Sequence, residues 1–341
     1  MKEYDVIIVG AGPAGLRCAE ILGQSDLSVL LLEKDKTFGN KVCAGGITRK
    51  DLAILDLPDK LIEHKITHTA IHSRKRSNDT IVPDPFVFTV NRNELGAWQR
   101  EQLKTTAVEV LTNSKVRSIE KDHLIVNQNT KFGFKYLVGS DGVNSIVRKH
   151  LQIPTEKLLI GIQYNIPGKF EPKLEIFMDS KLFGSWYAWI FPHKNSIAVG
   201  AVCDPKMMSS KLLKDNFHLW INQKGLNISK AKYSSWPINY DFRGIRFENV
   251  FLAGEAAGLA SGFTGEGIYQ SLVSGETVAN IILNKNHNSE EFDAMLKYNS
   301  IQNKIMKFLS KAGPLRGPIQ ETIVIALNNP AIQKRINQSF S

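Results

Sequence analysis

The opening of the chain constrains its fold more than any other feature. An apolar segment over residues 4–9 predicts a buried strand, and the sequence GAGPAG follows it directly over residues 10–15. The apolar spacing after this turn predicts a helix, and a second apolar strand over residues 27–32 ends in Glu33. Strand, glycine-rich turn, helix and strand ending in an acid are typical of a βαβ unit that binds a dinucleotide.

The residues of this turn have separate physical roles. Gly10 permits the tight turn, Gly12 lets the backbone approach a pyrophosphate, and Gly15 lets the helix pack closely on the strand. The helix N-terminus offers unpaired N–H groups and a partial positive charge to the phosphates. We count Ala14 with these cofactor-binding residues, and Glu33 is placed to accept hydrogen bonds from ribose hydroxyls. The turn alone does not distinguish FAD from NAD.

The bulk properties fit a globular protein. A chain of 341 residues with 43% hydrophobic and 22% charged residues can bury a large core, which predicts one large domain with a second lobe inserted in it. No apolar tract is long enough to cross a bilayer, and the N-terminus has no signal-peptide pattern. We therefore expect a cytoplasmic protein, with peripheral membrane contact as an open alternative.

Charge and cysteine content exclude some functions and leave others open. The net charge of +10 suits an anionic partner such as a nucleotide, a diphosphate or acidic lipid headgroups, but an ordinary lysine-rich surface would give the same charge. No motif for nucleic acid accompanies it. The cysteines Cys18, Cys43 and Cys203 have no metal-ligand spacing, so neither a metal site nor a disulfide framework is predicted. Cys18 and Cys203 are interpreted as packing residues.

Two later segments resemble the flavoprotein hydroxylase and reductase superfamily. Residues 136–148, YLVGSDGVNSIVR, resemble its "DG" segment, in which Asp141 can accept hydrogen bonds and a helix is expected to begin at Ser145. Residues 249–258, NVFLAGEAAG, resemble its third fingerprint, with Glu255 where the family usually has aspartate. The longer side chain leaves a direct, a water-bridged or no cofactor contact open.

The resemblance implies an FAD cofactor held by several distant segments. Arg92 matches the family position where an arginine begins a long helix beside FAD, and its alternative is an ordinary surface arginine. Together the fingerprints occur in the family's order. The FAD-binding residues implied here are Arg92, Asp141, Gly254 and Glu255.

Three further segments resemble the geranylgeranyl reductase family within this superfamily. They are residues 41–47, KVCAGGI, residues 185–192, SWYAWIFP, and residues 261–269, SGFTGEGIY. The resemblance implies that the first segment lies beside the isoalloxazine ring and that the third places backbone N–H groups near the flavin pyrimidine. The cofactor-binding residues implied are Lys41, Cys43, Ala44, Gly45, Gly46, Gly265, Gly267 and Ile268.

Candidate catalytic residues come from the same segments. Tyr187, Trp189 and Phe191 alternate along a predicted strand, so they share one face of a sheet. Periodicity alone favours an ordinary core, whereas the resemblance implies an aromatic wall for an isoprenoid chain. Cys43 could shield the flavin, donate a proton or pack as a small apolar group. We name Cys43, Tyr187 and Trp189 as the candidates.

The predicted fold is α/β, with a Rossmann-like FAD-binding domain, an inserted antiparallel β-sheet substrate domain and C-terminal helices. Residues 80–90 are expected to join that sheet, and Gly313-Pro314 and Gly317-Pro318 to interrupt the C-terminal helices. The apolar residues 319–327 are expected to pack against the body, with a cavity cover or a membrane contact as alternatives. The predicted boundaries are 1–75, 93–150 and 241–285 for the FAD-binding domain, 76–92 and 151–240 for the substrate domain, and 286–341 for the helical region.

The activity implied by the resemblance is reduction of C=C double bonds in a polyprenyl group by FAD. The electron donor would be NAD(P)H or another reductant, since no second glycine-rich motif for a nicotinamide is visible. The expected partner is a small isoprenoid or lipid substrate, and the protein is expected to be a monomer. The alternatives are an aromatic-type FAD monooxygenase on the same fold and a flavin electron carrier without an organic substrate.

Overall fold

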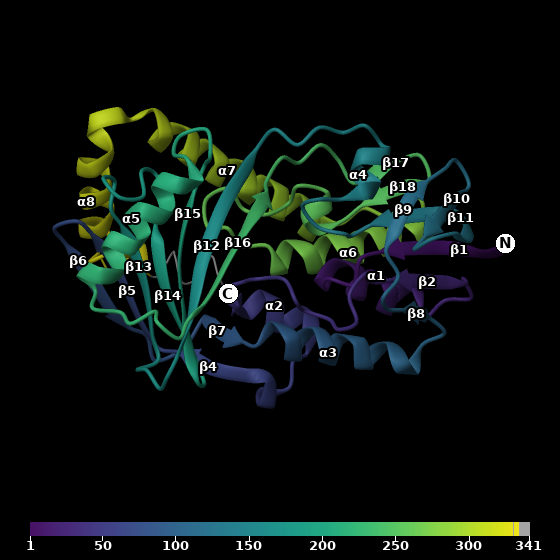
Figure 1. The fold of residues 1–341 in the computed structure, drawn as a ribbon, viewed down its shortest axis with the longest axis horizontal. Helices are drawn as coiled ribbons and strands as arrows, with labels where there is room; N and C mark the ends of the chain where they lie inside the picture. Colours follow the sequence, from purple (N-terminus) through teal and green to yellow (C-terminus); the bar gives the residue numbers. More distant parts are fainter. Residues whose placement is uncertain (330, 334–341) are drawn as a thin grey trace. The chain divides into compact units, whose positions relative to one another are not determined.

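The computed structural model describes residues 1–329 and 331–333, and they form two compact units (Figure 1). Unit 1 consists of Met1–Asn40, Arg92–Leu158 and Ile238–Ile301. Unit 2 consists of Lys41–Asn91, Leu159–Pro237 and the described residues from Gln302 onward. Each unit is therefore assembled from segments that are far apart in the sequence. Residues 41–75 were assigned above to the FAD-binding domain, but they belong to unit 2. Because compact units need not coincide with functional domains, the predicted domain boundaries stay a prediction.

Unit 1 is built on a largely parallel sheet. Its strand order is β17-β18-β11-β1-β2-β8, and β10 and β9 extend from β11 as an antiparallel pair. The central pairs β11-β1, β1-β2, β2-β8 and β11-β18 are parallel, as a βαβ unit requires. The bounds are β1 Lys2–Val9, β2 Val29–Leu32, β8 Glu109–Leu111, β9 Val116–Ile119, β10 His123–Val126, β11 Thr130–Gly139, β17 Arg246–Phe247 and β18 Val250–Leu252.

Helices cover the unit 1 sheet because its central strands are apolar on both faces. Ile7, Ile8, Leu30 and Leu31 are fully buried, so both sides of the sheet need a covering layer. Helix α1 contacts β1 and β2 and packs against α6 (Figure 1). The helices are α1 Pro13–Leu22, α3 Arg92–Gln102, η2 Leu103–Thr105, α4 Ile146–His150, η3 Gly254–Ala256 and α6 Ile268–Leu283.

Unit 2 contains a mixed sheet and a smaller antiparallel one. The larger sheet has the order β16-β12-β15-β14-β13-β5-β6, and the smaller has the order β3-β7-β4. The pairs β12-β15, β15-β14 and β14-β13 are antiparallel as expected. Strand β5, which was assigned to the FAD-binding domain, also joins this sheet; it pairs antiparallel with β6 and parallel with β13. The strands are β3 Gly46–Thr48, β4 Ile62–Ile66, β5 His68–Ser73, β6 Ser77–Ile81, β7 Val87–Val90, β12 Leu158–Pro167, β13 Lys173–Met178, β14 Ala188–His193, β15 Ser196–Cys203 and β16 Lys232–Asn239. The remaining helices before the tail are α2 Arg49–Leu55, η1 Asp59–Leu61 and α5 Ser210–Gln223.

The expectation that residues 80–90 join one sheet is correct only at their start. Strand β6 lies at the edge of the larger sheet, whereas β7 pairs with β3 and β4 in the smaller one. Pro83 and Pro85 lie between them, and proline cannot donate a backbone hydrogen bond to a strand ladder. The chain therefore leaves one sheet at these prolines and enters another.

The C-terminal part is helical, as predicted, up to the last described residues. Its elements are α7 Glu290–Lys311, η4 Gly313–Leu315 and α8 Arg316–Ala326. The break at Gly313-Pro314 is present, but Gly317-Pro318 does not interrupt the helix, because Pro318 falls in the first turn of α8, where its missing N–H has no helical partner to lose. The predicted helical region also covers residue 330 and residues 334–341, which lie outside the described residues.

Helix α8 packs on unit 2, as expected for its apolar residues. It contacts β5 and β6, Val324 is fully buried, and Gln320 Nε2 donates to Gly184 O at 3.1 Å. Ser73 Oγ donates to Glu321 Oε2 at 2.7 Å. Within the described residues, no helix is both long and apolar enough to cross a membrane.

Candidate functional site

The glycines of the first turn meet different surroundings. Gly10 has a φ of +98°, and a Cβ there would lie 2.6 Å from Ser140 O. A Cβ on Gly15 would lie 2.0 Å from Gly10 O, whereas a Cβ on Gly12 would meet no described atom within 4 Å. Gly10 and Gly15 are thus required by packing, and Gly12 borders open space. The observed packing agrees with the roles predicted for Gly10 and Gly15, and the role of Gly12 toward a pyrophosphate stays a prediction.

The N-terminus of α1 is open to an anion. Its N-cap is Gly12, which provides no side chain to bond the first N–H groups, and Pro13 follows it. Ala14 is buried and faces the turn of η3, because a Cβ on Gly254 would lie 3.1 Å from the Ala14 Cβ. A Cβ on Gly275 of α6 would lie 2.3 Å from Ala14 O. Two glycines therefore let α1, α6 and η3 approach closely.

Glu33 holds the glycine-rich turn in place. Its Oε2 accepts a hydrogen bond from Ala11 N at 2.8 Å, and its Oε1 accepts one from Asp35 N at 3.0 Å. Each carboxylate oxygen can accept a further hydrogen bond, so these contacts are compatible with binding ribose hydroxyls. The acid at the end of β2 thus shapes the turn, and its contact with a ribose stays a prediction.

Ser140 joins the DG segment to the first turn, and sequence analysis did not single it out. Its backbone N donates to Val9 O at 2.9 Å, and its Oγ lies 2.7 Å from Gly10 O. A Cβ on Gly15 would also lie 2.5 Å from Ser140 Oγ. A hydroxyl residue directly before Asp-Gly at the end of an apolar strand is the sequence signal that could have identified it.

Asp141 has one carboxylate oxygen engaged and one without a partner. Its Oδ2 accepts a hydrogen bond from Ile146 N at 2.6 Å, while its Oδ1 is buried with no hydrogen-bond partner among the described residues. Burial raises the pKa of Asp141 against the opposing hydrogen bonds from Ser145 and Ile146. As predicted, Ser145 begins the helix, since it is the N-cap of α4 and its Oγ accepts from Arg148 N at 2.9 Å.

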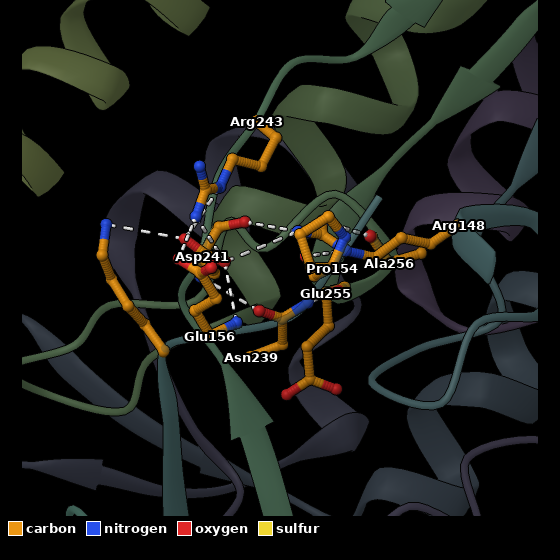
Figure 2. Close-up of polar contacts among 9 residues, drawn as sticks. Arg148, Pro154, Glu156, Asn239, Asp241, Arg243, Glu255 and Ala256 are labelled. Carbon is orange, nitrogen blue, oxygen red and sulfur yellow. Dashed lines mark hydrogen bonds and ion pairs between the residues drawn. The ribbon is translucent and has the colours of Figure 1, made fainter. Parts of the chain in front are cut away.

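The third fingerprint forms the short helix η3 directly after β18. Asn239 Nδ2 donates to Glu255 O at 3.0 Å, and Arg148 Nη1 donates to Ala256 O at 3.1 Å (Figure 2). The Glu255 carboxylate points away from Arg148 and Asp241 (Figure 2). A Cβ on Gly142 would lie 3.8 Å from Glu255 Oε2. The structure therefore brings the carboxylate of the third fingerprint to the turn of the DG segment.

A buried ionic cluster supports η3 (Figure 2). The Arg148 side chain is 2% exposed, and its Nη2 donates to Pro154 O at 2.7 Å and to Asp241 O at 2.8 Å. Asp241 is fully buried, and its carboxylate pairs with Arg243 at 3.1 Å and Lys157 at 3.5 Å. Sequence analysis quoted Arg148 only as the end of a motif and missed Asp241, because no local pattern links residues so far apart.

The ionisation of this cluster follows from its contacts. Burial alone would raise the pKa of Asp241, but the hydrogen bonds from Glu156 N and Arg243, together with the nearby Lys157, lower it instead. Burial lowers the pKa of Arg148, partly offset by Asp241. An ionised Asp241 beside Arg148 keeps both charges compensated inside the protein.

Arg92 begins α3, as predicted, and carries unpaired donors. Its Nε and Nη1 are buried and have no hydrogen-bond partner within the described part of the chain. A buried guanidinium donor without an acceptor is costly, so the site fits a ligand that brings acceptor oxygens. Together with the open space at Gly12 and the unpartnered Asp141 Oδ1, these atoms fit a polar cofactor such as FAD.

The predicted glycines before α6 form its N-terminus. Gly265 has a φ of +66°, and its N donates to Ser261 O at 3.0 Å. Gly267 is the N-cap of α6 without a side-chain cap, and Ile268 is the first helical residue. Ser274 Oγ of the same helix accepts from Gly254 N at 2.8 Å, which ties α6 to η3. Unit 1 thus contains the predicted cofactor-binding residues of the first turn, Glu33, Arg92, the DG segment, the third fingerprint and the start of α6.

The remaining predicted residues lie in unit 2. Tyr187 directly precedes β14, and its ring centroid is 6.1 Å from that of Trp189 in an edge arrangement. Trp189 is buried over Gly200 of β15, where a Cβ would lie 2.2 Å from the indole. Cys43 is partly exposed and accepts a hydrogen bond from Gly45 N at 3.4 Å. Lys41, Ala44, Gly45 and Gly46 belong to the same segment.

The other thiols are packing residues. Cys18 on α1 and Cys203 at the end of β15 are buried, and burial raises the pKa of both, that of Cys203 to about 12. Both interpretations from the sequence are confirmed. Among residues 1–329 and 331–333, no group of histidine, cysteine and acidic side chains is arranged to hold a metal ion.

A comparison with protein families identifies the cofactor. A family model described as an FAD binding domain matches residues 3–283. The chain belongs to the FAD-binding domain family. The FAD cofactor inferred from the sequence is thereby confirmed, and the unpaired donors of Arg92 lie within the matched region.

Within this family, the sequence relatives include named reductases. The chain is 28% identical over 301 residues to geranylgeranyl diphosphate reductase of Rhodobacter capsulatus, covering 81% of this chain and 74% of that protein. It is 30% identical over 332 residues to an uncharacterized protein of Methanosarcina barkeri, covering 92% and 82%. The crystal structure of a geranylgeranyl bacteriochlorophyll reductase-like protein of Thermoplasma acidophilum has the same fold, with a TM-score of 0.81, 19% identity and coverage of 95% and 91%.

These matches confirm the resemblance and the fold stated from the sequence. The protein is an FAD-dependent oxidoreductase whose sequence relatives include named geranylgeranyl diphosphate reductases, and its fold is α/β with a Rossmann-like FAD-binding part. The fold likeness extends over nearly the whole chain, including unit 2.

Proposed function

We propose that this protein reduces C=C double bonds of a polyprenyl group on a small isoprenoid or lipid substrate. The observation that carries the proposal is the match to the named geranylgeranyl diphosphate reductase over 81% of the chain, which includes segments of both units. Bound FAD supplies the electron pair and hydrogen that an alkene carbon receives, and a proton completes the second carbon. The residues of this chain bind the cofactor and the substrate, and one of them supplies that proton.

In this proposal, unit 1 binds the cofactor through the open N-termini of α1 and α6. Arg92 donates to acceptor oxygens of FAD from its unpaired Nε and Nη1, and Glu33 accepts from the ribose. Gly12 leaves space for the pyrophosphate. The further residues proposed to bind the cofactor are Gly10, Ala14, Gly15, Lys41, Cys43, Ala44, Gly45, Gly46, Asp141, Gly254, Glu255, Gly265, Gly267 and Ile268.

The proposed catalytic residues are Cys43, Tyr187 and Trp189. An unactivated alkene is a poor acceptor, so the residues around it must hold it in position and exclude water. The half-buried ring of Tyr187 offers apolar surface to an isoprenoid chain, and the buried ring of Trp189 supports it edge-on. Cys43 is the accessible thiol of the three cysteines and is proposed to deliver the proton.

The donor that reduces FAD is proposed to be NAD(P)H or another soluble reductant. We further propose that the enzyme is a cytoplasmic monomer that meets a lipid substrate at the membrane surface. The net charge of +10 supports attraction to an acidic lipid surface.

Turnover without oxygen tests the proposed reaction. The FAD-loaded protein is reduced chemically under anaerobic conditions and mixed with geranylgeranyl diphosphate or a geranylgeranylated glycerolipid, and the products are weighed by mass spectrometry. Addition of two hydrogen atoms per double bond supports a reductase. Unchanged lipid under anaerobic conditions, with an oxygen atom added when oxygen and NAD(P)H are present, identifies a monooxygenase instead. Flavin that exchanges electrons with protein acceptors while both lipids stay unchanged identifies an electron carrier.

A substitution at Cys43 tests its role. If the thiol donates the proton, Cys43→Ala lowers kcat by about a hundredfold, because general acid catalysis contributes at least this much, while FAD binding stays unchanged. Cys203→Ala is the matched control, since this thiol is buried in the sheet of unit 2. Equal alkene reduction by Cys43→Ala and the unmodified protein removes the thiol from the reaction.

A further inference from the structure

The segment that carries Cys43 is held by its backbone carbonyls. Cys43 O accepts from Gln163 Nε2 at 3.4 Å, and Ala44 O accepts from His193 Nε2 at 2.9 Å. Gly45 O accepts from Val90 N at 2.9 Å. Three successive carbonyls are thus bound by donors from β12, β14 and β7, all within unit 2.

Close packing reinforces these contacts. Gly45 has a φ of +75°, and a Cβ there would lie 2.7 Å from His193 Cε1 and 2.6 Å from Val90 O. A Cβ on Gly46 would lie 2.5 Å from the Phe191 ring. The segment therefore fits against the end of β14 only because two glycines leave room for the imidazole and the phenyl ring.

His193 is itself held by an acid. Its Nδ1 is hydrogen-bonded to Glu63 Oε2 of β4, and the two side chains are only 14% and 15% exposed. A backbone carbonyl can only accept, so the bond from His193 to Ala44 O requires a proton on Nε2. Burial would raise the pKa of Glu63, but the hydrogen bond and charge of His193 and the bond from Lys194 N lower it, which favours the carboxylate.

The surroundings of this pair contain few other ionisable groups. On β4 these are His64, which also lowers the pKa of Glu63, and Lys65, which pairs with Asp59 at 3.1 Å. Lys194 follows His193 in the turn between β14 and β15, and Lys41 belongs to the Cys43 segment. Strand β7 presents no ionisable side chain. Of the groups named here, Glu63 is the acid that pairs with His193, since Asp59 pairs with Lys65 and the others are basic.

We infer that His193 is a positioning residue that fixes Cys43 through the Ala44 carbonyl, with Glu63 holding the imidazole ring in place through Nδ1. The inference deepens the proposed function, in which the Cys43 segment borders the flavin. Loss of the bond to Ala44 O frees the segment to move, which changes the exposure of the Cys43 thiol.

The reactivity of Cys43 reports its position without requiring turnover. Cys18 and Cys203 are buried and their pKa values are raised, so iodoacetamide labels Cys43 selectively in the FAD-loaded protein. Peptide mass spectrometry confirms the labelled residue. The flavin absorption spectrum provides a second readout.

Two substitutions separate the two bonds of His193. His193→Asn places an amide near the Nδ1 position and loses the donor to Ala44 O, so Cys43 labelling is expected to change by about fivefold, the effect of one hydrogen bond. His193→Gln places a donor near the Nε2 position and is expected to restore most of the unmodified rate. Glu63→Gln keeps an acceptor for Nδ1 but removes the charge; it is expected to shift the pH dependence of labelling and serves as the second variant if His193→Asn does not fold.

The chain offers a matched control in the same unit. His72 Nε2 is hydrogen-bonded to Glu175 Oε2 at 2.9 Å, with similar exposures of 19% and 25%, but this pair binds β5 to β13. His72→Asn is expected to leave Cys43 labelling unchanged. If His193→Asn labels at the unmodified rate, or if His72→Asn changes the rate as much, the inference is overturned. If labelling changes as expected while the unmodified protein reduces no alkene, the positioning stands and the proposed function falls.

Discussion

Gly12 and Gly15 lie in one turn, but a side chain at each position has a different consequence. A Cβ on Gly15 would overlap Gly10 O at 2.0 Å, whereas one on Gly12 would meet no described atom. We expect Gly15→Ala to destabilise the protein by about 3 kcal/mol or to prevent folding. Gly12→Ala should change the free energy of unfolding of the FAD-free protein by less than about 0.5 kcal/mol.

The Gly12→Ala variant also tests where the pyrophosphate of FAD lies. Because the Gly12 Cβ would project into the space proposed for the phosphates, Gly12→Ala is expected to weaken FAD binding at least about tenfold, which corresponds to roughly 1.4 kcal/mol. Fluorescence titration with FAD and denaturant unfolding measure the two quantities separately. Unaltered FAD affinity in folded Gly12→Ala would contradict the placement.

Arg92 lowers the stability of the FAD-free protein, and bound FAD would remove this cost by supplying acceptor oxygens. Its buried Nε and Nη1 have no partner within the described residues, and an unsatisfied buried donor costs about 1–3 kcal/mol. Arg92→Met keeps the length and removes the donors, so the FAD-free protein is expected to become about 1 kcal/mol more stable while FAD binds more weakly. Arg100→Met, on the same helix, is the control. If Arg92→Met had a lower free energy of unfolding and an unchanged affinity for FAD, the proposed contact would be excluded.

At the scale of elements, η3 depends on a side chain from another segment. Arg148 donates to Ala256 O, Pro154 O and Asp241 O, and Asp241 is fully buried (Figure 2). Replacing Arg148 leaves these three carbonyl groups without their charged donor, so Arg148→Met is expected to cost about 3–5 kcal/mol and to weaken FAD binding by displacing η3.

The control for this prediction is an arginine with one backbone contact at the surface. Arg246 Nη1 donates to Lys285 O at 3.2 Å, and Arg246 is exposed, so Arg246→Met is expected to change stability by less than about 0.5 kcal/mol. Urea unfolding and FAD titration of both variants provide the comparison. Equal losses for the two arginines would show that the buried cluster does not support the turn.

At the scale of the whole molecule, acid stability follows from carboxylates with lowered pKa values. The hydrogen bond from His72 lowers the pKa of Glu175 below its ordinary value of 4.5, against partial burial. A lowered folded-state pKa contributes stability that is complete above pH 4.5 and is lost as the pH falls through the folded pKa. Asp141, whose pKa burial raises, contributes in the opposite direction.

Glu175→Gln tests the sign of this dependence. The variant is expected to be less stable than the unmodified protein by about 1 kcal/mol at pH 6, because the hydrogen bond from His72 then goes to a neutral amide instead of a charged carboxylate. The difference should shrink as the pH falls below 4.5, where Glu175 becomes protonated in the unmodified protein as well. Unfolding free energies measured across this range check it. A difference that grows toward acid pH would contradict the assignment.

The sequence by itself determined the features that depend on neighbouring residues. The turn at Gly10 and Gly15, the acid at the end of β2 and the N-cap at Ser145 each follow from a short pattern of backbone geometry and capping chemistry. The burial of Cys18 and Cys203 followed from the apolar residues around them. Such patterns identify the family because they recur wherever a chain must hold the same cofactor.

Only the tertiary structure decided which distant residues support those patterns. Ser140 reaches Gly10, Asp241 compensates Arg148, and His193 binds Ala44 across 149 positions of the sequence. No periodicity predicts these contacts, since each depends on the order and register of strands that the sequence only broadly indicated. The chain likewise passes from the larger sheet to the smaller one between β6 and β7. Pro83 and Pro85 lie at this point and cannot donate backbone hydrogen bonds, so β7 pairs with β3 and β4 instead.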